Sequence, residues 1–214
     1  MLKSRTRSVM YLSIVMLTLT GCATTLTTIE KSCGTGRKLN QCSGTLEVPA
    51  KHAAVIRQGA QIAIDRIYSD AIASELARFM DTNKDSIQLH PDWANLTPSG
   101  ILSSLRVNMD EARLGTHDGL GAWYYHHIYG SLALESIGTL PARINRWGIS
   151  GRRGGSIANT IVHEASHAAD LTHNDKDKVC SPPYVLGEII QRLENDDSGD
   201  MISHCRWFDA VSHQ

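Results

Sequence analysis

The chain has 214 residues, a formal net charge of −1 and 42% hydrophobic residues, and aromatic residues make up only 6% of it. A nearly neutral chain without a basic cluster does not attract nucleic acid, and a low aromatic content provides no stacking platform for bases. We therefore expect no nucleic-acid partner. The length fits a single domain with a substantial core.

The N-terminal segment has the organisation of a secretion signal. Three basic side chains precede an apolar run of eleven residues: Lys3, Arg5, Arg7 and then 9–19. A run of this length is too short to cross a bilayer as a helix, but it suits the centre of a signal peptide. It ends in Leu19-Thr20-Gly21-Cys22, which resembles the lipobox of bacterial lipoproteins.

The lipobox resemblance implies cleavage before Cys22 and acylation of its sulfur, with palmitate among the expected lipids. Residues 1–21 are then a lipoprotein signal peptide, and the mature protein contacts the membrane through its lipid anchor. Ala23 stands where an aspartate would resemble an inner-membrane retention signal, so we expect the outer membrane, facing the periplasm. An ordinary secretory signal is the alternative interpretation.

Four cysteines remain when Cys22 is set aside, an even count in a compartment that permits disulfides. Three pairings are possible. We favour Cys33 with Cys42 and Cys180 with Cys205, because each of these pairs closes a short local loop. A zinc-thiolate site is a poorer interpretation, since no C-x-x-C spacing occurs.

Residues 22–50 are rich in Thr, Ser and Gly, a composition that indicates a tether followed by a small loop. The folded domain then occupies residues 51–214. Recurring apolar positions predict a helix from Lys51 to about Met80, with a break near Ser69-Asp70. Helical spacing returns at 185–193.

Two stretches between these helices favour strands. The segment 121–129 is aromatic and β-prone. Its adjacent His126 and His127 would point to opposite faces of a sheet, so the two side chains cannot chelate one ion. The segment 140–147 alternates in character, and Pro141 confines it to a sheet edge or a strand start.

The stretch that indicates a chemistry runs from Ser156 to His173 and contains the pattern His-Glu-x-x-His. His163 and His167 are four residues apart, so on a helix both imidazoles stand on one face, about 6 Å apart along the axis. Both can then reach one metal ion. Glu164 is rotated by about 100° from His163, which suits a base acting on a water at that metal. Ser156 is the expected N-cap of this helix.

With His173 included, the pattern His163-Glu164-x-x-His167-x-x-Asp170-x-x-His173 resembles the extended zinc signature of the metzincin metallopeptidases. That family has glycine at the place of Asp170, where the helix stops and the chain turns the third histidine onto the metal. Aspartate also tolerates such a turn. The resemblance implies an α+β, zincin-like metallopeptidase domain with a mixed sheet and a metal-binding active-site helix. It also implies Zn²⁺ as the cofactor, held by His163, His167 and His173. The segment 140–147 resembles the substrate-binding edge strand of zincin folds, and an edge strand that binds nothing is the alternative.

Three other side chains compete with His173 for the third ligand position: Asp170, Asp175 and Glu188. On a continuing helix Asp170 would lie about 10.5 Å along the axis from His163, too far to share an ion. Glu188, on the expected second helix, resembles the glutamate ligand of thermolysin-like peptidases. Asp175 loosely resembles the aspartate ligand of the aspzincins. The residues that flank these two carboxylates match neither family.

The sequence therefore predicts a zinc-dependent hydrolase of peptide bonds in the bacterial envelope, with Glu164 activating a zinc-bound water. Tyr184, near the expected rim of the site, has two interpretations: a donor to the developing oxyanion, as in the peptidases that the motif resembles, or a packed side chain. The expected substrate is a peptide or protein, with the stem peptide of peptidoglycan among the candidates. The alternative is a metal-holding envelope lipoprotein with a binding or assembly role and no turnover, which closed coordination by four protein ligands would favour.

Overall fold

The computed structural model describes residues 26–30, 45–49, 52–111, 114–117, 142–145, 148–173, 176–198 and 205–209, with side chains for 52–107, 148–173, 176–198 and 205–208. Several predicted features lie outside the described residues: the signal peptide and Cys22, the Cys33–Cys42 pair, the strand at 121–129 and Asp175.

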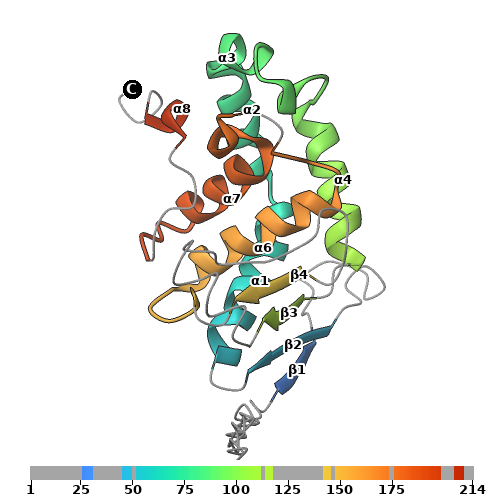
Figure 1. Cartoon of the computed structure of the whole chain (residues 1–214), viewed down its shortest axis with the longest axis vertical. Coiled ribbons are helices and arrows are strands. Elements are labelled where there is room, and N and C mark those ends of the chain that lie inside the picture. Colours follow the sequence, from blue (N-terminus) through green and yellow to red (C-terminus); the bar gives the residue numbers. More distant parts are fainter. Residues whose placement is uncertain are drawn as a thin grey trace, which may run out of the picture.

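Helices dominate this structure (Figure 1). They are α1 (Ala53–Ile67), α2 (Asp70–Thr82), α3 (Lys84–Gln88), α4 (Pro98–Glu111), α6 (Gly154–Ala168), α7 (Pro182–Leu193) and α8 (Arg206–Asp209), with the 3₁₀ turns η3 (Pro91–Trp93) and η5 (Lys178–Cys180). Among the described residues, no helix combines the length and the apolar character needed to cross a membrane.

The predicted break between the first two helices is confirmed. The helix α1 ends at Ile67 and α2 begins at Asp70. Ser69 causes the break, because its backbone is extended and its hydroxyl accepts a hydrogen bond from the backbone N–H of Ile72 at 3.4 Å. This is the usual way in which a serine begins a helix.

The core is formed around α6, which packs against α7 and α1 in the middle of the molecule (Figure 1). All residues of α6 from Gly154 to His167 are buried. On the α1 side, Gly59 permits close approach, because a Cβ at that position would lie 2.5 Å from Cγ2 of Ile157. A helix that is buried on all sides holds its side chains in fixed positions, which suits a metal site.

The backbone also traces four short strands: β1 (Leu26–Glu30), β2 (Thr45–Pro49), β3 (Leu114–His117) and β4 (Ala142–Asn145). They follow the order β1-β2-β3-β4, with β1 and β2 antiparallel and the other two pairs parallel. The strand β4 falls within the stretch 140–147 and stands last in this order.

The prediction of an α+β zincin-like domain with a mixed sheet is wrong for the part of the chain whose side chains the structure describes. Where side chains are described, 74% of the residues are helical and none lies in a strand. Every described core residue comes from a helix or a loop. The physical reason is that other helices bury α6: its apolar face needs a hydrophobic partner, and α1 and α7 provide one through close glycine contacts.

Candidate metal centre

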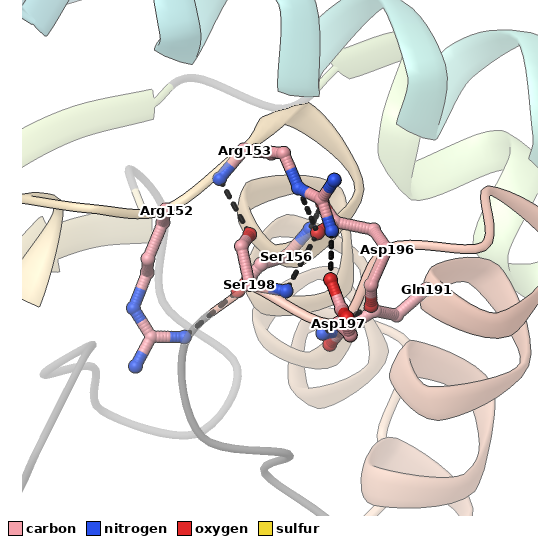
Figure 2. A network of polar contacts seen from close by, with 7 residues as sticks. All are labelled: Arg152, Arg153, Ser156, Gln191, Asp196, Asp197 and Ser198. Atoms are coloured by element: carbon pink, nitrogen blue, oxygen red, sulfur yellow. Dashed lines mark hydrogen bonds and ion pairs between the residues drawn. The ribbon is translucent and has the colours of Figure 1, made fainter.

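The N-terminus of α6 is held by a carboxylate from a distant part of the chain. The helix begins at Gly154, two residues before Ser156, which corrects the prediction that Ser156 is the N-cap. Figure 2 shows Asp196 at this end of the helix, close to Arg153 and Ser156. The backbone N–H of Ser156 donates to Oδ2 of Asp196 at 2.8 Å, and Nε of Arg153 donates to Oδ1 at 3.0 Å. The carboxylate thus satisfies an N–H group that the helix leaves without an internal partner.

The charge of Asp196 suits this position. Burial on its own would raise the pKa of this carboxyl, but hydrogen bonds from Ser198, Ser156 and Arg153 outweigh burial and lower the pKa below its usual value of 3.8. Arg153 also pairs with Asp197 (Figure 2). A negative charge next to the first turn of a helix is further favoured by the helix dipole.

The C-terminus of α6 makes the turn that the third histidine needs. Asp170 has a φ of 61°, in the left-handed region. The N–H of Leu171 donates to the carbonyl of Ser166 at 3.0 Å, and the N–H of Asp170 donates to that of His167 at 3.1 Å. These two bonds form a Schellman motif, in which the left-handed residue reverses the chain. The expectation of a chain reversal near Asp170 is confirmed, and it returns His173 toward the helix.

His163, His167 and His173 lie together and could hold a metal ion. One ring nitrogen from each histidine lies within 4.8 Å of the others, and two of the three side chains are buried. Nε2 of His173 is 3.3 Å from Nε2 of His163. Two nitrogens bound at about 2.0–2.1 Å to one tetrahedral ion lie about 3.4 Å apart, so the spacing of these two nitrogens fits a shared ion.

Hydrogen bonds set the tautomers of two rings. Nδ1 of His167 lies 2.8 Å from the carbonyl oxygen of Leu171, which can only accept, so this nitrogen carries the proton. Nδ1 of His173 lies 2.6 Å from Oγ of Ser181, whose own proton goes to the carbonyl of Lys178. Both rings therefore present the lone pair on Nε2, the form in which imidazole binds a metal.

The electrostatics of the three rings favour neutral ligands. Burial lowers the pKa of His163 well below its usual value of 6.5, and the neighbouring His167 and His173 lower it further. Burial lowers the pKa of His167 as well, against the opposing effect of its bond to Leu171. Burial lowers the pKa of His173 to about 4, with a further lowering by His167. All three imidazoles are therefore neutral at neutral pH, as metal binding requires.

Glu164 and Tyr184 lie at the same centre. The ring of Tyr184 is 4.5 Å from that of His163 and 4.8 Å from that of His173, between centroids. Burial raises the pKa of Tyr184 above its usual value of 10, and the charge of Glu164 raises it further. The phenol therefore keeps its proton at neutral pH. Glu164, which is itself buried, lies close enough to Tyr184 to act on its ionisation.

The competing ligands are placed elsewhere, as far as the structure describes them. Glu188 is fully buried on α7, where Oε1 accepts a hydrogen bond from Nε of Arg192 at 2.8 Å. Asp170 is exposed at the turn after α6. Among the described side chains, neither carboxylate joins the group formed by the three histidines.

The loop that carries Ser181 is held at several points. A disulfide joins Cys180 to Cys205, the pairing that loop length favours. Nε1 of Trp93 donates to the carbonyl of Cys180 at 2.8 Å.

Sequence reasoning did not find the roles of Ser181 and Asp196. The sequence signal for Ser181 was its place before Pro182-Pro183 at a helix start, whereas Asp196 lies 40 residues from Ser156 and has no local signal.

Comparisons of this chain with protein-family models, with curated proteins and with solved structures find no match, so the chemistry of the site rests on its own residues.

Proposed function

We propose that this protein is a zinc-dependent hydrolase of peptide bonds. The observation that carries the proposal is the group of three histidine nitrogens within reach of one ion, with a glutamate next to the first histidine. Structural zinc sites use four protein ligands, whereas catalytic sites use three and keep one position open. Within the described side chains the group contains three possible ligands, which favours the catalytic type.

Zinc is the proposed metal because three neutral imidazoles match its ligand preference and the 3.3 Å nitrogen separation suits tetrahedral coordination. The ion would be held by His163, His167 and His173. When bound, it would lower the pKa of a coordinated water toward about 7 and polarise a carbonyl group.

Glu164 is the proposed general base. Its carboxylate takes a proton from the attacking water while the hydroxide oxygen bonds to the carbonyl carbon of the substrate. The C–N bond then breaks, and the same proton passes from Glu164 to the leaving amine. The products are a carboxylic acid and an amine, so atoms and charge balance.

Tyr184 is the proposed oxyanion donor. Its phenol is protonated at neutral pH, because burial and Glu164 raise its pKa, and its ring lies against two of the three histidines. A hydrogen bond from this phenol would strengthen as charge develops on the carbonyl oxygen of the substrate.

The proposed location is the bacterial envelope, with a lipid anchor at Cys22 in the outer membrane, and the proposed substrates are peptides, including peptidoglycan stem peptides. The lipobox-like residues that precede Cys22 support this location. Cys22→Ser is expected to release the protein from the membrane fraction. Equal membrane partitioning of the variant and the wild type would contradict the anchor.

The test of the catalytic proposal compares Glu164→Gln with Glu75→Gln, the same change at a surface carboxylate of α2 that pairs with Arg78. Both variants are expected to contain stoichiometric zinc, measured by elemental analysis. Turnover of a peptide library should be lost only in Glu164→Gln, because this change removes the base and spares the imidazoles. Zinc without turnover in the wild type would instead support the metal-holding lipoprotein.

A further inference from the structure

We propose that Ser181 is the positioning residue for the third metal ligand: it fixes the ring and the tautomer of His173 so that Nε2 faces the metal. This inference rests on the proposed function, since it assumes that the three histidines bind an ion. It adds a residue outside the His-Glu-x-x-His segment to the site.

Ser181 accepts a hydrogen bond from His173, because its own proton is used elsewhere. The hydroxyl of Ser181 has one proton, which it donates to the carbonyl oxygen of Lys178. The contact of 2.6 Å between Oγ of Ser181 and Nδ1 of His173 must then use the proton of the imidazole. The serine oxygen is therefore an acceptor that holds the proton on Nδ1 and leaves Nε2 as the ligand atom.

The position of Ser181 at the start of α7 supports a role in holding His173, because its hydroxyl does not cap the helix. Ser181 is the N-cap residue of α7, a position where serine usually caps the helix with its hydroxyl. Here the side chain makes no capping hydrogen bond, and the first two helical residues are Pro182 and Pro183, which have no N–H to cap. The hydroxyl instead links Lys178 to His173.

The backbone around Ser181 is held firmly enough to transmit this restraint. Ser181 is fully buried, and the preceding Cys180 is tied to Cys205 by the disulfide and to Trp93 by a hydrogen bond. The N–H of Ser181 also donates to the carbonyl of Lys178 at 3.0 Å. An acceptor that cannot move fixes the orientation of the ring that binds it.

His173 depends on such a restraint more than the other two ligands do. His163 and His167 are on a buried helix, whereas His173 follows the turn after α6 and is half-buried. The ring of His167 is oriented by the backbone carbonyl of Leu171. The ring of His173 is held instead by a side chain from another segment, the hydroxyl of Ser181.

The test uses the full chain with zinc itself as the probe, titrated in competition with a chelator. Ser181→Ala is expected to lower zinc affinity by about 10- to 100-fold, the usual effect of losing a group that orients a metal ligand. Ser181→Thr keeps the hydroxyl and is expected to restore most of the affinity. The matched control is Ser166→Ala, which removes another fully buried serine hydroxyl, one that donates to the carbonyl of Val162.

A second measurement separates positioning from a general loss of structure. Nitrogen NMR of the zinc-free protein should show His173 with its proton on Nδ1 in the wild type and a mixture of tautomers in Ser181→Ala. The same tautomer and the same zinc affinity in Ser181→Ala and the wild type would overturn the inference. If the wild type binds no zinc, the proposed function fails, and the ring tautomer alone then decides for or against the positioning role of Ser181.

Discussion

Replacing Gly187 with alanine is expected to destabilise the protein, because α6 and α7 meet at this residue. A Cβ at Gly187 would lie 2.1 Å from Oδ1 of Asn159 and 2.9 Å from its backbone oxygen. The amide of Asn159 can rotate away, but its backbone oxygen is part of α6 and cannot move without shifting the helix. The same helix carries His163, so the contact at Gly187 also sets the distance between the metal ligands and α7.

The magnitude follows from three contributions. Inserting a methyl group into a packed contact destabilises by about 1–3 kcal/mol. Moving the Asn159 side chain breaks its buried hydrogen bond to Oε1 of Gln191, which is 2.6 Å long, and this loss adds roughly 1 kcal/mol. Alanine is favoured over glycine within a helix by up to about 1 kcal/mol, which offsets part of the loss. We expect a net destabilisation of about 1–3 kcal/mol, or a decrease in Tm of about 2–12 °C for a chain of this size.

Urea and thermal unfolding in the presence of a chelator would measure this difference without a contribution from metal binding. The control is Gly100→Ala, because Gly100 is an exposed helical glycine of α4 whose added Cβ would meet only the Thr97 hydroxyl, at 3.0 Å. Asn159→Ala in the Gly187→Ala background should recover part of the loss by making room. A Gly187→Ala variant within about 0.5 kcal/mol of the wild type would refute the reasoning.

Three further predictions concern the two ends of α6 and the loop after it. Asp196→Asn should lower the free energy of unfolding by about 0.5–2 kcal/mol at pH 7, as the loss of a helix cap does. The folded pKa of Asp196 is below its usual 3.8, so its stabilisation is complete above that pH and is lost as pH falls through the folded pKa. Urea unfolding of both proteins should therefore converge in strong acid, and a constant difference would contradict the assignment. Cys205→Ser opens a disulfide that spans 25 residues and should cost about 3–4 kcal/mol in urea unfolding; an unchanged midpoint would contradict this. His173→Ala should lower zinc affinity by orders of magnitude while Glu188→Ala keeps stoichiometric zinc, and the opposite result in metal analysis would make Glu188 the third ligand.

The sequence by itself determined those features that depend on neighbours along the chain. The spacing of four residues places His163 and His167 on one helical face, because an α-helix repeats every 3.6 residues. Asp170 stands where the chain must turn, and the structure places it in the left-handed region, which aspartate tolerates better than most residues. The short separation of Cys180 from Cys205 likewise favoured the disulfide that the structure contains.

Only the tertiary structure decided the surroundings of that helix. The α+β prediction followed from a resemblance confined to the metal-binding segment, and nothing in that segment specifies whether a sheet or other helices cover its apolar face. The capping of α6 by Asp196 and the contact between Gly187 and Asn159 join residues that are 40 and 28 positions apart. Ser181 bonds His173 through a loop whose course depends on Trp93 and Cys205. Local propensity contains no information on such pairs, because their energies arise when distant segments pack together.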